Sequence, residues 1–269
     1  MSGPVVFVSD LGLRDEFVGV CHLVMARIAP DLRVVNLSHG VPPHDVLAGA
    51  MVLAHGLPYG GPTAIGLAVV DPGVGGTERD IVVATAAGPY LVGPDNGLLS
   101  LAWKALGGPT AAVAIDHGAI GATEVSAVFH GRDVFSPAAA LLAIGRGIET
   151  LGNPIDTAGL HRIDIEDAET QPGRVHGAVL DIDRFGNIRL NVRPEDLERA
   201  GLEIGAAVEV ATTQTSIRAQ LIVAYSDVLP TEYGLLVDAW GWVSVIRYEA
   251  SAAAGMGVTR GDPVWIAAG

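Results

Sequence analysis

Hydrophobic and polar positions alternate in blocks along the first half of the chain. Short apolar runs predict buried strands, at 5–8, 34–37, 64–70, 81–85 and 111–115. Apolar residues at helical spacing lie between or after them, at 15–29, at 44–54 and from 136 onwards. Because strands alternate with helices, this half predicts an α/β domain of three layers, with a mostly parallel sheet between helices.

Local signals place the ends of these helices. Pro30 ends the first of them, and His44-Asp45 opens the second. Ser136-Pro137 is typical of a helix start, with serine as the N-cap and proline at the first helical position. Gly145 or Gly147 then closes that helix.

The pattern changes after about residue 150. Asn153-Pro154 and the polar stretch IDIEDAETQPG, residues 163–173, predict a linker. Short strands separated by turn residues follow, at 175–182, 188–192, 207–211, 217–223, 234–238, 242–248 and 263–267. This spacing favours a small antiparallel barrel. We therefore predict an N-terminal α/β domain at 1–165 and a C-terminal antiparallel β-barrel domain at 173–269.

Composition and charge narrow the class of protein. The 269 residues are 49% hydrophobic, and 30 acidic residues face 16 basic ones, for a net charge of -14. A protein that reads a nucleic-acid backbone needs a basic surface, so no nucleic-acid partner is expected. Cys21 is the single cysteine, which excludes an intrachain disulfide and CxxC motifs.

Neither a secretory signal nor a membrane span is expected from the sequence. The N-terminal stretch MSGPVVFVSD has no basic region before its short apolar run. The longest uncharged stretch, near 51–70, is interrupted by glycine and proline. The predicted location is the cytoplasm.

Two carboxylates follow predicted strands, where open α/β sheets place their ligands. Asp10, in SDLGLRDEF with Asp15, could accept two hydrogen bonds from a vicinal diol such as a ribose, or could cap a turn. Asp71 opens VVDPGVGGTERD at 69–80, a loop without the Lys-Ser/Thr of a phosphate-binding P-loop. Its glycines would let backbone approach a ligand. Arg79 has the reach to fold back beside Asp71, and the alternative is a salt bridge that pins the loop.

Two further segments carry candidate chemistry. His130, in FHGRD, lies in a predicted loop at the sheet end, although a lone loop histidine is more often structural. In DIDRFGNIRLN, Asp183, Phe185 and Asn187 surround a tight turn. An asparagine amide can pair with a purine edge and a phenylalanine ring can stack on it; the alternative is an ordinary hairpin. The turn Asp95-Asn96-Gly97 is assigned no chemistry.

Taken in order, these motifs resemble the S-adenosylmethionine hydroxide adenosyltransferase family, relatives of the fluorinases and chlorinases. The resemblance covers nearly the whole chain, through SDLG-x-x-D, VDPGVG-x-x-R, GPDNGLL, FHGRD-F-P and DRFGN. It implies a homotrimer whose substrate lies between the first domain of one subunit and the second domain of its neighbour. The implied reaction is hydrolysis of S-adenosyl-L-methionine to adenosine and L-methionine, with water attacking the ribose 5′ carbon.

The resemblance also implies roles for individual residues. Asp71, Arg79 and His130 match the catalytic triad of the water-using members, although this chain has an extra glycine, Gly75-Gly76, before the arginine. The matching substrate-binding positions are Asp10 at the ribose, Asp15 and Asp183 near methionine, and Phe185, Asn187, Tyr225 and Arg247 at adenine. A family serine near methionine is replaced by Ala239. No cofactor or metal is implied, because the sulfonium already activates its own leaving group.

Other functions compete with this interpretation. A metal-dependent nucleoside hydrolase could hold a divalent ion with Asp10, Asp15, Asp71 and His130. A non-catalytic S-adenosylmethionine- or adenosine-binding protein would keep Asp10, Asp183 and Asn187 without needing Arg79 and His130 together. Halide use is disfavoured by the triad and by the absence of an extra loop in the first domain.

Overall fold

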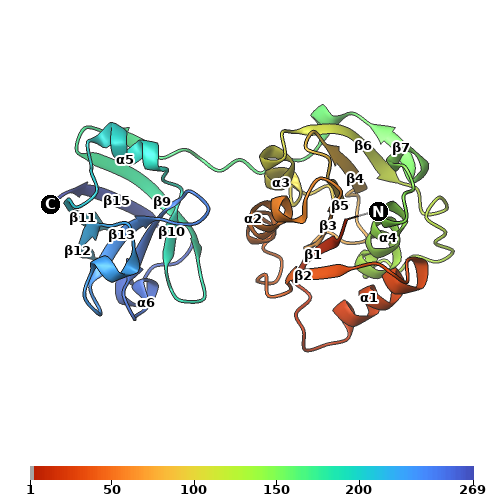
Figure 1. Ribbon diagram of the computed structural model, residues 1–269, viewed down its shortest axis with the longest axis horizontal. Helices are drawn as coiled ribbons and strands as arrows, with labels where there is room; N and C mark the ends of the chain where they lie inside the picture. Colours follow the sequence, from red (N-terminus) through yellow and green to blue (C-terminus); the bar gives the residue numbers. More distant parts are fainter. Residues whose placement is uncertain (1–2) are drawn as a thin grey trace. The chain divides into compact units, whose positions relative to one another are not determined.

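The computed structural model describes residues 3–269, which divide into two compact units. The first ends at Ile163 and the second spans Asp164–Gly269. Figure 1 colours the first unit from red to green and the second from green to blue. Residues 1 and 2 of the predicted first domain lie outside the described residues.

The first unit is built on one seven-stranded sheet in the order β2-β1-β3-β5-β4-β6-β7. Its strands are β1 Val5–Ser9, β2 Val34–Ser38, β3 Ile65–Val69, β4 Asp80–Thr85, β5 Tyr90–Pro94, β6 Pro109–Ile115 and β7 Gly152–Ile155. The pairs β1–β2, β1–β3 and β3–β5 are parallel. Strand β4 is antiparallel to β5 and β6, and β7 to β6. Only β4 and β7 therefore oppose the common direction within this sheet, which confirms the mostly parallel prediction.

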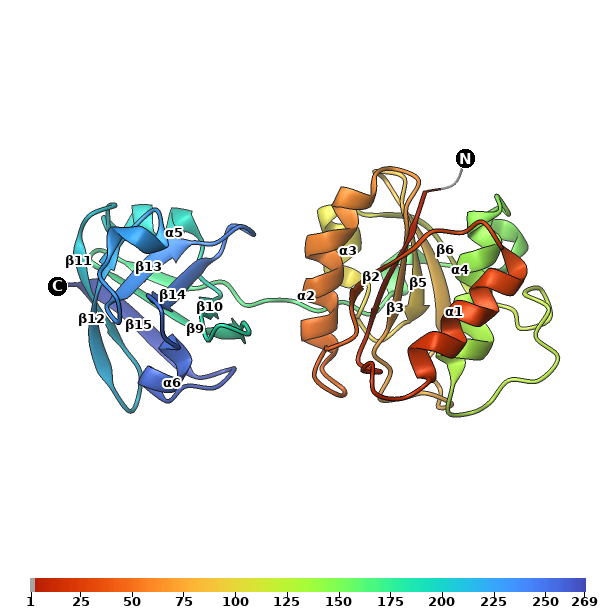
Figure 2. The same ribbon diagram turned by 60° about the horizontal axis from the view of Figure 1, so that its bottom comes forward.

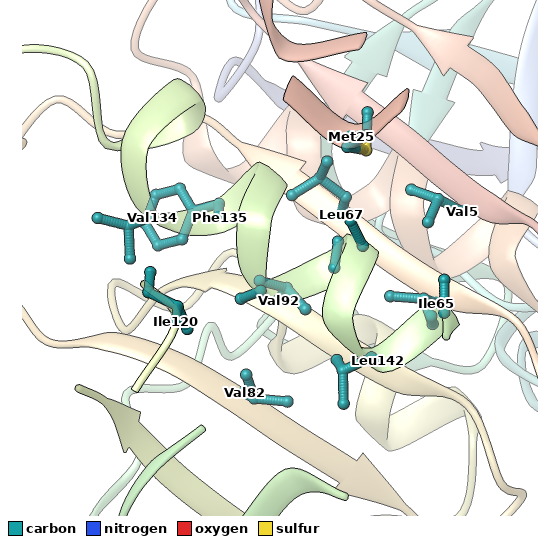
Figure 3. Close-up of a cluster of buried hydrophobic side chains, with 14 of the residues drawn as sticks. Val5, Met25, Ile65, Leu67, Val82, Val92, Ile120, Val134, Phe135 and Leu142 are labelled. Carbon is teal, nitrogen blue, oxygen red and sulfur yellow. The ribbon is translucent and has the colours of Figure 1, made fainter. Parts of the chain in front are cut away.

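Helices cover both faces of the sheet, as Figure 2 shows. They are α1 Phe17–Ile28, α2 Val46–Gly56, α3 Ser100–Ala105 and α4 Ser136–Ala143. Helices α1 and α4 enclose one apolar core, in which Met25, Leu67 and Phe135 are buried together (Figure 3). Helices α2 and α3 enclose the other. The predicted three layers are confirmed, and Asp45 caps α2 as expected by accepting from the Ala48 N–H at 3.0 Å.

Two local predictions in this unit are wrong, and two elements were missed. Ser136 is not an N-cap, because a π-helical turn at Gly131–Phe135 runs directly into α4. Its hydroxyl donates instead to the Gly131 carbonyl at 2.7 Å. Asn153 and Pro154 do not belong to a linker but to edge strand β7, where proline is tolerated. Strand β5 and helix α3 were not predicted; both are short and flanked by glycine-containing turns.

The second unit is a closed barrel of seven mostly antiparallel strands, as predicted. They are β9 Arg174–Ile182, β10 Ile188–Leu190, β11 Ala207–Ala211, β12 Ser216–Leu221, β13 Tyr233–Val237, β14 Val243–Arg247 and β15 Pro263–Ala268. The pairing of β9 with β10 closes the ring, and β12–β13 is its parallel pair. Strand β8, Glu169–Gln171, adds to β9, and two helices that were not predicted, α5 Pro194–Ala200 and α6 Ala252–Met256, flank the barrel.

Alternate positions of the barrel strands form one buried core, which includes Val175, Leu190, Val210, Leu235 and Val245. The intervening strand positions carry polar residues such as His176, Glu209 and Arg218. Among the described helices of the chain, none combines the length and the apolar character needed to cross a membrane.

Candidate functional site

Asp10 and Asp71 follow two strands that are neighbours in the sheet. Strand β1 ends at Ser9 and β3 at Val69, and these two residues are register partners. The Asp10 N–H donates to the Val69 carbonyl at 3.3 Å, which ties the two strand ends together. Both carboxylates therefore lie at the carboxyl edge of the parallel strands, where this architecture places ligands.

A cavity of about 280 Å³ opens at this edge and is lined by Asp10, Asp71 and His130. Much of its remaining wall is apolar, from Leu11, Phe17, Val69, Val74 and Phe129. The Asp10 Oδ2 accepts from the His44 N–H at 2.9 Å, and His44 holds a positive φ of 68° to make that contact. The cavity thus combines an apolar wall with a few polar groups, which is typical of small-molecule sites.

Asp71 is the least satisfied polar group of the cavity. Its Oδ1 atom is buried and has no hydrogen-bond partner. Burial raises the pKa of Asp71 to about 6, and the negative charges of Glu78 and Asp80 add to the rise, which His130 partly offsets. A buried, unpaired carboxylate oxygen beside a cavity is a candidate for contact with a ligand or a reacting water.

His130 is held by a carboxylate that the sequence analysis did not single out. Its Nδ1 lies 3.0 Å from Asp80 Oδ1, and Asp80 Oδ2 lies 3.4 Å from His117 Nε2. One atom each from Asp71, Asp80 and His130 lie within 4.8 Å of one another, so the three could also share a cation. Asp80 was missed because Arg79-Asp80 resembles an ordinary local ion pair before a strand.

Arg79 does not lie where the sequence led us to expect. Its guanidinium binds the Asp95 carboxylate, with Nε at 2.9 Å, and also donates to the Gly159 carbonyl at 2.8 Å. Asp95 has a side chain only 1% exposed, and its backbone N–H donates to the Arg79 carbonyl at 2.9 Å. A buried charge needs a partner more than a half-buried one does. Asp95, and not Asp71, therefore captures the arginine.

The turn that contains Asp95 also positions Asp71. Asn96 donates from Nδ2 to the Val70 carbonyl at 3.0 Å, directly before Asp71. This turn, to which the sequence assigned no chemistry, contacts the end of β3 through Asn96 on one side and Arg79 through Asp95 on the other. The signal that could have found it is a carboxylate, Asp95, placed directly after the stretch YLVGP at 90–94.

The glycines of the loop serve a packing contact within the protein. Gly75 adopts a φ of +75°, and a Cβ there would come 2.1 Å from the Ala127 carbonyl oxygen. Glycine is therefore required where this loop crosses the segment before His130. We had expected these glycines to admit a ligand; the close approach found here is to the protein backbone.

A second polar cluster lies at one end of the barrel, where Asp183 follows β9. Asp183 Oδ1 accepts from the N–H groups of Phe185 at 2.8 Å and Asn187 at 3.0 Å, and Oδ2 accepts from Asn187 Nδ2 at 2.8 Å. Asn187 Nδ2 also lies 3.3 Å from the Tyr225 hydroxyl. A small cavity of about 40 Å³ lies among Asp183, Asn187, Arg189, Tyr225, Asp238 and Ser244.

The aromatic rings of this cluster remain accessible. Phe185 is 70% exposed at the tip of the turn, and Tyr225 is partly exposed. Burial raises the pKa of the Tyr225 hydroxyl, with Asp183 and Asp238 adding to the rise, so it stays protonated. The turn therefore presents an aromatic face beside fixed amide and hydroxyl groups.

Two predicted residues lie outside these clusters. Asp15 is exposed in the bend before α1. Arg247 donates from Nε to the Thr231 carbonyl at 3.0 Å, and its guanidinium lies 5.2 Å from the Tyr233 ring centroid. Neither lines the cavities described here.

Carboxylates and an imidazole beside a cavity at the edge of an α/β sheet are typical of enzymes that act on small molecules, and the barrel adds an Asp–Asn–Tyr cluster. The family model of the SAM hydroxide adenosyltransferase N-terminal domain matches residues 5–152, and that of the C-terminal domain matches 177–265. The chain belongs to the SAM hydroxide adenosyltransferase family, as its motifs indicated.

Relatives agree over nearly the full length. The "(R)-S-adenosyl-L-methionine hydrolase" of Salinispora tropica is 42% identical over 265 residues, covering 98% of each chain. The protein of the same name from Salinispora arenicola is 39% identical, again with 98% of each chain covered. An uncharacterized conserved protein from Thermotoga maritima, known from its crystal structure, is 28% identical with a TM-score of 0.91, covering 98% of this chain and 99% of its own.

Proposed function

We propose that this chain hydrolyses S-adenosyl-L-methionine to adenosine and L-methionine, by attack of water on the ribose 5′ carbon. Family membership and the names of the full-length relatives support the substrate. The observation that carries the proposal is the unpaired, buried oxygen of Asp71 in a cavity shared with His130 and Asp10.

The chemistry required of the protein is activation of the nucleophile. The leaving group is a neutral thioether that departs from a sulfonium, so no general acid is needed. Water, with a bulk pKa of about 15.7, is a weak nucleophile at neutral pH. Asp71, whose pKa is raised to about 6, is mostly ionised at pH 7 and is a stronger base than an ordinary aspartate. We propose that Asp71 and His130 orient and deprotonate the water, while Asp10 accepts from the ribose hydroxyls.

Arg79 takes a supporting role in this proposal. Its contacts with Asp95 and Gly159 hold the end of the 71–80 loop at the start of β4, which fixes Asp80 beside His130. Of the predicted catalytic triad, we thus propose that Asp71 and His130 act on the attacking water and that Arg79 stabilises the loop.

The barrel residues are proposed to bind the two ends of the substrate. Phe185 and Tyr225 offer aromatic surface to adenine, and Asn187 is fixed by Asp183 to present its amide. As the family resemblance implies, Arg247 would contact the purine. Asp183 and Asp15 would bind the methionine ammonium. We propose that the chain has no resident cofactor and that it acts in the cytoplasm.

We further propose that the chain forms a homotrimer in which residues of the first unit and of a neighbour's barrel share one substrate. Complementation tests this directly. The Asp71→Asn variant should have almost no turnover, and the Asp183→Ala variant should have little activity at S-adenosyl-L-methionine concentrations far below its raised KM. At such a concentration the two should regain activity when they are mixed and reassembled, because some sites then receive neither substitution. Sedimentation of a monomer, or no recovery in a verified mixed trimer, would contradict the shared site.

A metal-dependent nucleoside hydrolase is the second candidate, favoured by the close approach of Asp71, Asp80 and His130. The deciding experiment is incubation of the purified chain with S-adenosyl-L-methionine, with and without EDTA, followed by product identification. Adenosine and methionine in both arms support our proposal. Free adenine, or activity that EDTA abolishes and calcium restores, supports the competitor. Tight binding without any product would indicate a binding protein.

A further inference from the structure

We propose that Asp80 is the positioning residue of His130 and that His117 acts on the same site through Asp80. This inference rests on the proposed function, because it assigns residues that support the same reacting water. None of the five motifs that carried the family resemblance pointed to Asp80 or His117.

Three segments far apart in the sequence meet at this point. Asp80 is the first residue of β4, His117 follows β6, and His130 immediately precedes the π-helical turn. One carboxylate oxygen of Asp80 serves each histidine, at 3.0 Å for His130 and 3.4 Å for His117. The side chains of Asp80 and His130 are only 10% and 13% exposed, whereas His117 is 45% exposed. The three groups thus lead from the cavity wall to solvent.

The contact with Asp80 selects one hydrogen-bonding state of His130. An ionised carboxylate only accepts hydrogen bonds, so the Nδ1 atom of His130 is the donor. In the neutral ring, Nε2 is then left as an acceptor and can take a hydrogen bond from water. The same carboxylate stabilises the positive charge that the ring gains when it accepts a proton, as in other Asp–His pairs.

The proposed reaction needs such an acceptor. The C5′–S bond breaks with its electron pair going to sulfur, a C5′–O bond forms, and one proton of the water is released. We assign that proton to Nε2 of His130 or to the Asp71 carboxylate. His117, which is the exposed end of the hydrogen-bonded series His130–Asp80–His117, connects Asp80 with bulk water. No oxidant, reductant or further reactant is required.

Few charged side chains face the series His130–Asp80–His117. Asp71 faces His130 and Asp80, Glu78 faces Asp71, and Asp133 lies near His130 but is paired with Arg132. The Phe135 ring packs against the His130 ring, with centroids 6.3 Å apart. Asp80 is therefore the carboxylate that is hydrogen-bonded to His130.

The test uses Asp80→Asn, which keeps the shape but removes the charge. We expect kcat to fall 10- to 100-fold while KM for S-adenosyl-L-methionine changes less than twofold, since loss of an orienting partner typically has this size. Asp116→Asn is the matched control: it removes a charge next to His117, from a side chain that accepts a hydrogen bond from the Ala119 N–H. It should leave both constants unchanged. Wild-type kcat for Asp80→Asn would overturn the proposal.

Coupling tests the role of His117. We expect His117→Gln to lower kcat two- to fivefold in the wild-type background and to have no further effect in Asp80→Asn, because it acts through Asp80. The same factor in both backgrounds would overturn this part.

A readout independent of activity separates this inference from the proposed function. Nitrogen-15 NMR of the full chain should show His130 protonated at Nδ1 and unprotonated at Nε2, and a loss of that preference in Asp80→Asn. An Nε2–H tautomer in the wild type would overturn the inference even if hydrolysis is observed. The Nδ1–H tautomer in a chain that yields no adenosine would uphold the geometry while the proposed function fails.

Discussion

Asp71 in the first unit and Asp183 in the barrel are both carboxylates that follow a strand, but their surroundings are opposite. Asp71 keeps a buried oxygen without a partner beside a cavity of about 280 Å³. Asp183 has both oxygens engaged by its own turn, beside a cavity of about 40 Å³. A buried carboxylate oxygen without a hydrogen-bond partner lowers the stability of the fold but leaves the group able to accept a proton. A carboxylate whose oxygens are both hydrogen-bonded instead holds its turn in one conformation, which suits substrate binding. This difference is the basis for our proposal that the first unit carries the chemistry and the barrel positions the substrate.

The largest expected effect comes from Asp71→Asn. We expect the turnover of bound S-adenosyl-L-methionine to fall at least about 100-fold, because the base is removed. The affinity should change less than threefold, and the melting temperature should stay equal or rise, because the substitution removes a charge whose Oδ1 atom is buried without a hydrogen-bond partner. Single-turnover kinetics, calorimetric titration and thermal unfolding measure these quantities.

The neighbouring Glu78→Gln variant is the control for Asp71→Asn, since Glu78 is exposed in the same loop. It should lower turnover less than threefold. An Asp71→Asn variant that turns over normally would place the chemistry elsewhere.

Asp183→Ala should show the opposite signature. It leaves the N–H groups of Phe185 and Asn187 without their acceptor and frees the Asn187 amide. We expect KM to rise about 10- to 100-fold, equivalent to about 1.4–2.8 kcal/mol, with kcat within threefold. Asp262→Ala is a matched control, because Asp262 caps another barrel turn through Thr259. A fall in kcat with KM unchanged would remove the distinction between the two units.

Arg79→Ala tests whether the arginine is supporting or catalytic. Its loss leaves the buried Asp95 with weaker partners, so we expect the first unit to lose about 1–3 kcal/mol of stability in urea unfolding. Arg146→Ala, which removes contacts to two exposed carbonyls, should cost less than about 0.5 kcal/mol. An Arg79→Ala variant with wild-type stability but no turnover would instead indicate that Arg79 takes part directly in catalysis.

The last effect develops gradually with pH and concerns a buried histidine of the first unit. His39 packs against Ser9, and burial lowers its pKa to about 4 from an ordinary 6.5. Between these values the unfolded chain binds more protons, so this group costs stability as the pH falls from 6.5 to 4. Asp71, with its raised pKa, acts in the opposite sense between about 4 and 6.

The comparison of wild type with His39→Gln isolates the histidine. We expect the variant to lose up to about 1.4 kcal/mol less stability per pH unit in this window, as measured by urea unfolding at several pH values. Parallel curves for the two proteins would show that His39 is not the titrating group.

Hydrophobic periodicity predicted most of the fold. The apolar runs at β1 and β3 and the alternating strands of the barrel are dictated by burial, which sequence reports directly. Strand ends then located Asp10 and Asp71. The start of α4 was mispredicted because the π-helical turn that precedes it depends on a Ser136–Gly131 contact that follows from packing and has no sequence signal.

The partners of long side chains were less accessible to sequence reasoning. Arg79 has the reach for either Asp71 or Asp95, and only the burial of Asp95 decides between them. Asp80 and His117 are 37 residues apart, and the sheet order that places β4 beside β6 brings them together. Spacing in the sequence could identify the chemical groups but not which of them meet.

Incorporation of oxygen-18 tests the central claim most directly. The purified, metal-free chain is incubated with S-adenosyl-L-methionine in oxygen-18 water, and the products are identified by mass spectrometry. The account predicts unlabelled L-methionine and adenosine with a single heavy oxygen at its 5′ hydroxyl. Adenosine without the label, or free adenine with the label in the sugar, would contradict it.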